Sequence, residues 1–309
     1  MNTIAVVFEG PERLALRELP LVERTADAVM VDIEWSGIST GTERLLWSGK
    51  MPPFPGLQYP LVPGYESVGR VVEADAAGRF AVGARVFVPG ASCYGEVKGL
   101  FGGAASRLVV PAARLTALDD SLGEEGVLLA LAATAWHALE GGEGAELIVG
   151  HGVLGRLLAR LAVARGGSPV VWENNRARAT GALGYRVTTS EEDPRRDYAT
   201  ICDVSGDAGL VEPLLGRLKR GGELTLAGFY PDRVSFAFPV AFMKEARLRV
   251  AAEWQPADLH AVHALVRTGE LSLQGLITHR APSAHAADAY AIAFSDPGCL
   301  KMLLDWRTR

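Results

Sequence analysis

Residues Gly150 to Gly155 read GHGVLG and lie between an apolar run at 145–149 (AELIV) and an amphipathic stretch at 157–163 (LLARLAV). A glycine-rich turn between a strand and a helix is the context in which the GxGxxG pattern binds a dinucleotide. The first glycine permits the tight turn, the second lets the backbone approach a pyrophosphate, and the third lets helix and strand pack closely. The stretch therefore predicts a parallel, doubly wound α/β domain with a pyrophosphate at the helix N-terminus.

An acidic residue supports this prediction. A second apolar run, 169–172 (PVVW), is followed by Glu173, about 20 residues after Gly150. A carboxylate there accepts hydrogen bonds from ribose hydroxyls and repels a 2′-phosphate, so we expect NAD, although nearby arginines could pair with a phosphate. The predicted cofactor-binding residues are Gly150, His151, Gly152, Val153, Leu154, Gly155, Glu173, Arg176 and Gly206. A glycine turn in an unrelated α/β unit would give a similar pattern, and this alternative stays open here.

The composition excludes several classes of protein. The chain has 309 residues, enough for about two domains, and is 49% hydrophobic and 22% charged, which is unlike a disordered chain. A net charge of −5 argues against a nucleic-acid partner. The cysteines are scattered, which excludes a disulfide framework and predicts a cytoplasmic protein. We expect no signal peptide and at most a peripheral association with membranes, since the longest apolar stretch, around 127–135, is too short to span one.

Residues 1 to about 118 are typical of a β-rich domain, because short alternating runs are separated by glycine and proline. These runs occupy residues 28–33, 68–72, 85–88 and 107–110. Between them, residues 45–66 are too rich in proline for a helix or central strand, so we expect a long ordered loop. Its aromatic side chains could belong to the core or form a wall for a flat ligand.

The pattern changes to helical from Ser121, where Ser121 and Glu124 predict a capping box before an apolar helix. Further along the chain we expect strands at 200–204, 223–228 and 248–252 and helices at 210–218 and 259–266. The tail from residue 271 is expected to return to the first domain. We therefore place the β-rich domain at residues 1–120 and 272–309 and the dinucleotide-binding domain at 121–271.

Several stretches, in the right order, resemble the medium-chain dehydrogenase/reductase superfamily. They are GYESVG at 64–69, VGARV at 82–86, the GHGVLG turn and RGGEL at 220–224. The resemblance covers essentially the whole chain. It implies a GroES-like catalytic domain, a Rossmann domain, an active site in the cleft between them, and a homodimer formed through the edge of the Rossmann sheet.

The chain departs from the zinc enzymes of that superfamily. Those enzymes carry a cysteine where this chain has Ser39 or Thr40, a histidine where it has Tyr65, and a third ligand near Ala130. Of that set only Glu66 remains, and the four-cysteine structural lobe is absent. Zinc prefers several Cys or His ligands in a tetrahedral array, so we expect no metal.

Six stretches carry a narrower resemblance: SGISTGTE at 36–43, PGYESVGRVV at 63–72, GLFGGAASRLVVP at 99–111, GHGVLGRL at 150–157, AAEWQPADL at 251–259 and GLITHR at 275–280. Together they are similar to the bacteriochlorophyllide dehydrogenases of pigment biosynthesis. That resemblance implies an NAD-dependent oxidoreductase whose substrate is a tetrapyrrole. It would oxidise the 3-(1-hydroxyethyl) group of a bacteriochlorophyllide or chlorophyllide to a 3-acetyl group.

Oxidation of a secondary alcohol needs a hydride acceptor and a base for the hydroxyl proton. Tyr65 is the predicted proton-transfer residue if nearby cations lower its pKa from about 10, and otherwise a packing residue. Glu66 is expected as a supporting acid or, alternatively, in direct proton transfer, and Thr42 with Glu43 as a relay to solvent. The side chains predicted to contact the tetrapyrrole are Trp47, Phe54 and Tyr59.

Two other functions stay open at this point. One is a zinc-free NAD(P)H quinone or enone reductase of the same fold, which would favour NADPH and substrates with a double bond. The other is a non-catalytic protein that binds a nucleotide or a pigment. Such a carrier would bind pigment without NAD-dependent turnover.

Overall fold

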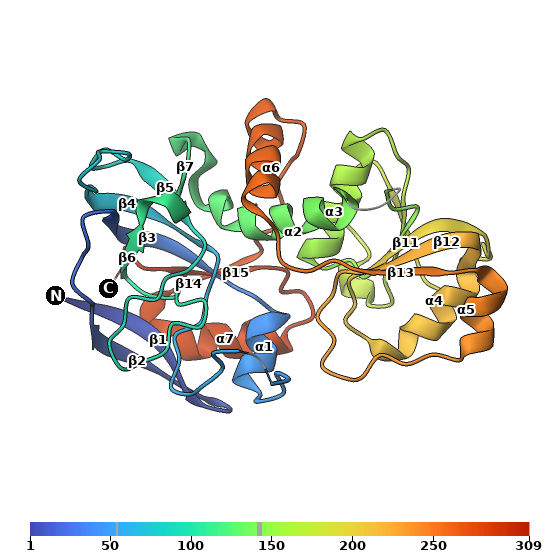
Figure 1. Cartoon of the computed structure of the whole chain (residues 1–309), viewed down its shortest axis with the longest axis horizontal. Coiled ribbons are helices and arrows are strands. Elements are labelled where there is room, and N and C mark those ends of the chain that lie inside the picture. Colours follow the sequence, from blue (N-terminus) through green and yellow to red (C-terminus); the bar gives the residue numbers. More distant parts are fainter. Residues whose placement is uncertain (54, 141–143, 309) are drawn as a thin grey trace. The chain divides into compact units, whose positions relative to one another are not determined.

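The computed structural model describes residues 1–53, 55–140 and 144–308, which form two compact units (Figure 1). The first unit comprises Met1–Ala130 and Leu276–Arg309, and the second comprises Leu131–Gly275. The predicted boundaries, after residues 120 and 271, fall earlier in the chain. The first boundary differs because the 3₁₀ turns at Asp120–Leu128 contact three strands of the first unit.

The first unit consists mainly of antiparallel strands. Their bounds are β1 Asn2–Gly10, β2 Arg13–Pro20, β3 Ala28–Ile38, β4 Ser67–Glu73, β5 Arg85–Val88, β6 Arg107–Pro111, β7 Thr116–Ala117, β14 His279–Pro282 and β15 Met302–Asp305. β1 pairs with β2, and the larger sheet has the order β14-β15-β3-β4-β5-β7, with β6 also paired to β3. Two helices, α1 (Thr42–Trp47) and α7 (Ala286–Ser295), belong to this unit.

The alternating runs at 28–33, 68–72, 85–88 and 107–110 are confirmed as strands of this sheet. β3 lies in the middle of this sheet, with neighbours on both edges. Residues 28–31, 33 and 35–38 of the strand are therefore buried. The core beneath it gathers large apolar side chains from β1, β6 and α7 as well: Phe8, Val31, Leu108 and Tyr290.

The loop predicted at 45–66 begins later than expected. Residues 45–47 are the last turn of α1, where Leu46 is fully buried and Ser48 N–H closes the helix on the Arg44 carbonyl. Burial of Leu46 and Met51 against the core holds this end of the segment in place. Phe54 lies outside the described residues.

The second unit contains a parallel sheet of six strands among its described residues. The strands are β8 Leu147–Val149, β9 Val170–Trp172, β10 Arg186–Thr188, β11 Tyr198–Asp203, β12 Leu218–Leu226 and β13 Arg247–Val250. Their order is β10-β9-β8-β11-β12-β13, which is the 3-2-1-4-5-6 order of the Rossmann fold. The helices are α2 Leu129–Glu140, α3 Val153–Ala164, α4 Val211–Arg217, α5 Phe238–Lys244 and α6 Pro256–Thr268, with α2 starting in the first unit. The predicted Rossmann domain, a doubly wound parallel sheet with helices, is thereby confirmed.

Two local predictions need correction. Ser121 is not a helix cap: Asp119 caps a 3₁₀ turn by accepting from Ser121 N, and Glu124 instead binds Arg280 from β14. The regular alternation of strands and helices also fails between β9 and β10, where the described chain forms only the 3₁₀ turn Arg176–Arg178. No helix in the described part of the chain is long and apolar enough to cross a membrane.

Candidate functional site

The glycine turn stands where β8 passes into α3 in the second unit. Gly150 has φ +105°, a conformation that side chains rarely adopt. A Cβ at Gly155 would lie 1.9 Å from the Gly150 carbonyl oxygen, so only glycine permits this close packing of helix on turn. A Cβ at Gly152 would meet no atom within 4 Å, which leaves open space beside the helix N-terminus. The first N–H groups of α3 (Val153, Leu154) point out of the helix end and can bind an anion.

The turn lies at the point where the strand order of the sheet reverses, between β8 and β11. In open α/β sheets, ligands bind outside the carboxyl ends of the strands at this point. Gly206 follows β11 there with φ +71°, and a Cβ on it would lie 2.6 Å from the Phe229 carbonyl oxygen. The topology thus brings Gly150 and Gly206 to the same end of the sheet.

Glu173 follows β9 at the same sheet end and is half-buried. Its Oε2 accepts from the His151 backbone N–H at 3.1 Å and its Oε1 accepts from Asn175 N–H at 2.7 Å. The carboxylate is therefore oriented by the glycine turn itself and retains free lone pairs for a ribose hydroxyl. Arg176, three residues later, is exposed.

The His151 side chain has a role that the sequence did not indicate. The ring is fully buried, Nδ1 donates to the Arg178 carbonyl oxygen at 2.6 Å, and Nε2 accepts from the Tyr185 hydroxyl at 2.8 Å. Burial lowers the pKa of His151 to about 4, so the ring is neutral, as these two bonds require. Arg156 also donates to the Arg178 and Thr180 carbonyl oxygens. His151 and Arg156 therefore fasten the segment after β9 to the glycine turn.

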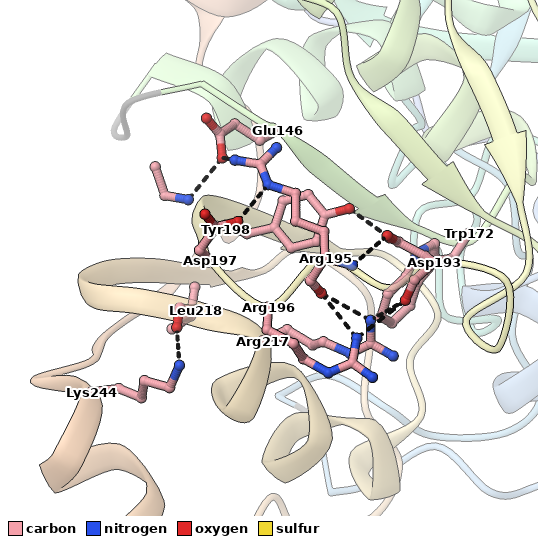
Figure 2. A network of polar contacts seen from close by, with 11 residues as sticks. Glu146, Trp172, Asp193, Arg195, Arg196, Asp197, Tyr198, Arg217, Leu218 and Lys244 are labelled. Carbon is pink, nitrogen blue, oxygen red and sulfur yellow. Dashed lines mark hydrogen bonds and ion pairs between the residues drawn. The ribbon is translucent and has the colours of Figure 1, made fainter.

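A second buried network holds the segment between β10 and β11, and Figure 2 shows the side chains of Trp172 and Tyr198 turned toward Asp193. The Asp193 Oδ2 accepts from Trp172 Nε1 at 2.7 Å and from the Tyr198 hydroxyl at 2.5 Å, while Oδ1 accepts from Arg195 N at 3.0 Å. Burial opposes ionisation of Asp193, but these bonds outweigh it and lower its pKa. The network anchors Trp172, the last residue of β9, directly before Glu173.

In the first unit, Tyr65 lies just before β4, and its hydroxyl donates to Ser39 Oγ at 2.6 Å. The Thr42 hydroxyl is a further hydrogen-bonding neighbour of the phenol. Burial, followed by the nearby Glu66 carboxylate, raises the pKa of Tyr65 above its ordinary value. The condition set for Tyr65 as a preformed base, a pKa lowered by cations, is therefore not met by its neighbours in this unit.

Glu66 is fully buried. Its Oε2 accepts from Lys301 Nζ at 2.6 Å, and the same ammonium group donates to the Ile38 carbonyl oxygen at 3.2 Å. Oε1 has no hydrogen-bond partner in the described residues. A Cβ at Gly37 would lie 2.3 Å from Oε2, so the glycine gives the carboxylate its room. This burial and pairing favour the supporting role among the two that the sequence left open.

Glu43, in the first turn of α1, is a second fully buried carboxyl group. Its Oε1 accepts from Ser39 N–H at 3.2 Å and its Oε2 accepts from the Tyr290 hydroxyl at 2.7 Å. Burial raises the pKa of Glu43 to about 7, although Tyr290 and Lys301 act in the opposite direction. The relay to solvent proposed for Thr42 and Glu43 thus begins at a carboxyl group that water does not reach in this structure.

Trp47 and Tyr59, two aromatic residues of the 45–66 segment, pack on the core while staying part-exposed. The Trp47 ring lies 5.5 Å from the Phe294 ring, and the Tyr59 hydroxyl donates to the Leu46 carbonyl oxygen. Both side chains therefore have a structural role, which does not exclude a ligand on their exposed faces. Phe54 cannot be placed with them.

No group of three or more metal-binding side chains occurs in the described residues. Ser39, Tyr65 and Ala130 occupy the positions where zinc relatives would carry ligands, and Glu66 is engaged by Lys301. A hydroxyl, a phenol and a methyl group are poor ligands for zinc. The expectation that the chain uses no metal remains a prediction.

Comparisons with known proteins agree with this geometry. Residues 25–120 match the alcohol dehydrogenase GroES-like domain family. The chain is 59% identical, over 99% of both chains, to the 2-desacetyl-2-hydroxyethyl bacteriochlorophyllide A dehydrogenase of Rhodobacter capsulatus. It is 56% identical, over 99% of both chains, to that of Cereibacter sphaeroides. Among solved structures, acetophenone reductase from Geotrichum candidum in complex with NAD superposes with a TM-score of 0.84 at 17% identity, covering 98% of this chain and 97% of that one.

Proposed function

The chain belongs to the family of 2-desacetyl-2-hydroxyethyl bacteriochlorophyllide A dehydrogenases, and from this premise we propose that it oxidises the 3-(1-hydroxyethyl) group of a bacteriochlorophyllide to 3-acetyl. The observation that carries the proposal is 59% identity over 99% of both chains. The reaction belongs to bacteriochlorophyll biosynthesis, and the matching chlorin is a second expected substrate.

We propose that NAD, held by the second unit, accepts the hydride. The residues present fit a dinucleotide: open space beside Gly152 and the free N–H groups of α3 suit the pyrophosphate, and Glu173 suits the ribose. When bound, NAD⁺ supplies the chemistry of hydride acceptance. The neutral His151 ring supports the site by holding the chain behind the glycine turn.

The choice of NAD over NADP can be tested at Glu173. Wild-type protein should show a kcat/KM for NAD⁺ at least about tenfold above that for NADP⁺, because a carboxylate beside a 2′-phosphate costs more than about 1.4 kcal/mol. Glu173→Ser should narrow the ratio, whereas Glu191→Ser, which changes an exposed acid in the same unit, should leave it unchanged. Equal use of both cofactors by the wild type would contradict the proposal.

We propose that Tyr65 moves the substrate proton as a neutral phenol within a chain of hydroxyls. A phenol that donates to Ser39 Oγ at 2.6 Å can release its proton to the serine while it accepts another from the substrate. Thr42 adds a third hydroxyl beside this pair. Glu66 then acts indirectly, by holding Lys301, which donates to the Ile38 carbonyl oxygen next to Ser39.

We propose that the exposed faces of Trp47 and Tyr59 contact the flat face of the tetrapyrrole, and Phe54 remains a third predicted contact. Wide apolar surfaces suit a macrocycle better than a small polar alcohol, which needs several convergent hydrogen-bonding groups. Trp47→Ala should raise KM more than it lowers kcat, because the ring would bind ground state and transition state alike. A large fall in kcat with KM unchanged would argue against a binding role.

The decisive assay follows the visible spectrum of 3-hydroxyethyl bacteriochlorophyllide with NAD⁺. Conversion to a conjugated carbonyl should shift the long-wavelength band to the red while NADH accumulates in equal amount. Turnover of quinones or enones with NADPH, and none of the pigment, would instead favour the reductase alternative. Pigment binding without turnover would favour a carrier.

We also propose that catalysis needs no zinc, given the side chains at positions 39, 65 and 130. Elemental analysis of active protein should find well below one zinc per chain, and a chelator should leave the rate unchanged. One tightly bound zinc whose removal abolishes activity would overturn this.

We propose a homodimer formed through the edge strand β13. Large apolar side chains are exposed on β13 and α5: Val250 is 73% exposed, Met243 71% and Phe238 71%. Exposed apolar surface next to a strand edge is typical of an interface. Light scattering should give twice the chain mass, and Val250→Asp should halve it. The three cysteines are buried and form no disulfide in the part of the chain that the structure describes, which suits the cytoplasm as the proposed compartment.

A further inference from the structure

Among the described residues of the first unit, the carboxyl groups of Glu43 and Glu66 and the ammonium group of Lys301 form a cluster that water does not reach. Glu43, Glu66 and Lys301 are each at most 1% exposed. Lys301 pairs with Glu66 Oε2 at 2.6 Å, and no salt bridge to Glu43 is found in the described residues. With both carboxyl groups ionised, the cluster would carry one uncompensated negative charge in the protein interior, which is costly.

Glu43 is the member of this cluster that can exchange a proton. Glu66 pairs directly with the Lys301 ammonium group, whereas the donors to Glu43 among the described residues are the neutral Ser39 N–H and Tyr290 OH. Beside burial, the groups that act on its pKa are Tyr290 on α7, Glu66 before β4, Lys301 before β15 and Ser39 after β3. Of these, Glu66 disfavours the charged form and the other three favour it.

Glu43 is also linked to the hydroxyl pair proposed to move the substrate proton. Ser39 donates its N–H to Glu43 Oε1 at 3.2 Å, and its Oγ accepts from the Tyr65 hydroxyl at 2.6 Å. One residue thus contacts both the carboxyl group and the phenol. Ser39 is therefore the residue that connects the phenol to the carboxyl group.

We propose that Glu43 stores the proton that leaves the substrate hydroxyl, receiving it through Tyr65 and Ser39. This inference rests on the proposed dehydrogenase function. In the step, the C–H bond of the hydroxyethyl carbon breaks and its electron pair leaves as hydride to NAD⁺. The O–H bond breaks, the C=O bond forms, and the Glu43 carboxylate becomes a carboxylic acid. Glu43 does not touch the substrate, so its role is indirect.

The charge balance explains why a buried group suits this task. Hydride transfer would remove the positive charge of the nicotinamide. The proton of the substrate hydroxyl needs an acceptor at the same time. Burial penalises the charged form of a carboxyl group, so a buried carboxylate accepts a proton more readily than an exposed one. The proton returns to water in a later step, on reopening of the hydroxyl chain.

The first arm of the test needs neither cofactor nor pigment. Infrared difference spectra of the ligand-free protein between pH 5 and pH 9 should show the carbonyl band of a protonated carboxylic acid that titrates near pH 7. Glu43→Gln should remove this band. Tyr290→Phe should shift its midpoint upward by roughly one pH unit, because the carboxylate loses a hydrogen-bond donor. Tyr94→Phe, which removes a buried phenol that donates to Gly102 in the same unit, should change nothing.

The second arm measures kcat for pigment oxidation against pH. The wild-type rate should rise with pH through the same midpoint, since the acceptor works only when ionised. Glu43→Gln should lose this rise and about 10- to 100-fold of the rate at pH 8, and Tyr290→Phe should shift the rise upward.

The possible failures are distinguishable. A wild-type protein that does not oxidise the pigment would overturn the proposed function, and with it this inference. Active wild-type enzyme whose pH profile is unchanged in Glu43→Gln, or whose carbonyl band survives that substitution, would overturn the inference alone. If Glu43→Gln does not fold, the Tyr290→Phe variant is decisive. An unchanged midpoint of both the infrared titration and the pH–rate profile in that variant would overturn the inference.

Discussion

Two buried polar networks of the second unit and one buried cluster of the first differ in how fully their ionisable groups are paired. In the second unit, Asp193 accepts three hydrogen bonds through its carboxylate, and each ring nitrogen of His151 has a partner. In the first unit, Glu66 Oε1 has no hydrogen-bond partner in the described residues, and Glu43 has donors but no direct cation. The His151 and Asp193 networks are satisfied in a single protonation state, and the cluster of Glu43, Glu66 and Lys301 is not.

This difference separates two tasks within one enzyme. A dinucleotide site benefits from fixed geometry, and fully satisfied polar networks favour a single arrangement. Proton transfer needs a group whose two protonation states lie close in free energy, which incomplete pairing provides. Substitutions in the first unit should therefore affect the rate and its pH dependence, and those in the second should affect stability and cofactor binding.

The largest effect is expected at Tyr65. Tyr65→Phe should lower kcat by roughly 10²–10⁴-fold, the usual range for an acid–base group, while the Kd for NAD⁺ stays unchanged. Stopped-flow measurement of pigment oxidation and a fluorescence titration with NADH would measure the two quantities. Tyr94→Phe is the matched control, and a near-normal kcat in Tyr65→Phe would return Tyr65 to a packing role.

Removal of the Lys301 ammonium group should show how strongly the stability of the fold depends on the buried Glu66–Lys301 pair. Lys301→Met leaves Glu66 buried without its partner and should lower the free energy of unfolding by about 3–5 kcal/mol. Adding Glu66→Gln should restore part of this loss, because no unpaired charge then remains. Denaturant unfolding of both variants measures the effect, with Lys219→Met at an exposed site as control. Equal stability of Lys301→Met and wild type would show that Glu66 is not held as a buried charge.

The pH dependence of stability should identify Glu43. Its folded-state pKa of about 7 lies above the ordinary value of 4.5, so the folded protein binds more protons between these limits and loses stability as pH rises through them. His151, with a pKa lowered to about 4, gives a slope of opposite sign between about pH 4 and 6.5. The measured quantity is therefore the difference between Glu43→Gln and wild type. Relative to wild type, the free energy of unfolding of Glu43→Gln should rise by roughly 3 kcal/mol between pH 4.5 and pH 8. A difference that does not change with pH would contradict a raised pKa at Glu43.

A smaller and pH-independent effect is expected at Asp193. Asp193→Asn replaces one acceptor oxygen by a donor and should cost about 2 kcal/mol, the range for hydrogen bonds to a charged group. The cost should be the same at pH 6 and pH 8, since the network has one protonation state. Asp197→Asn, in an exposed pair with Arg195, should cost under about 1 kcal/mol. A strong pH dependence of the Asp193 variant would remove the contrast between the units.

The parts of this structure that local sequence determines were predictable. GHGVLG between an apolar run and an amphipathic stretch predicted β8, the turn and α3, and alternating runs predicted β3 to β6, because period and glycine position act within a few residues. Ser39, Tyr65 and Glu66 were noted because they stand at positions that carry metal ligands in related enzymes. Their actual roles were not visible there.

Contacts between distant residues were not predictable. Lys301 reaches Glu66 across 235 positions and Tyr290 reaches Glu43 across 247, and no local pattern encodes such pairs. The capping box at Ser121 was wrong for the same reason: Glu124 has the right spacing but pairs with Arg280, 156 residues away. The available signal was a lysine directly before the apolar run 302–304, since an ammonium group buried beside such a run needs an acid as its partner.

His151 occupies a position of the glycine motif that is usually free to vary, and its ring holds a segment nearly thirty residues further along the chain. This has an evolutionary consequence. A lineage that loses the imidazole leaves the Tyr185 hydroxyl without its acceptor and the Arg178 carbonyl with one donor fewer. His151, Arg156 and Tyr185 should therefore change together among descendants of this enzyme, as one inherited unit, while the glycines beside them stay the same.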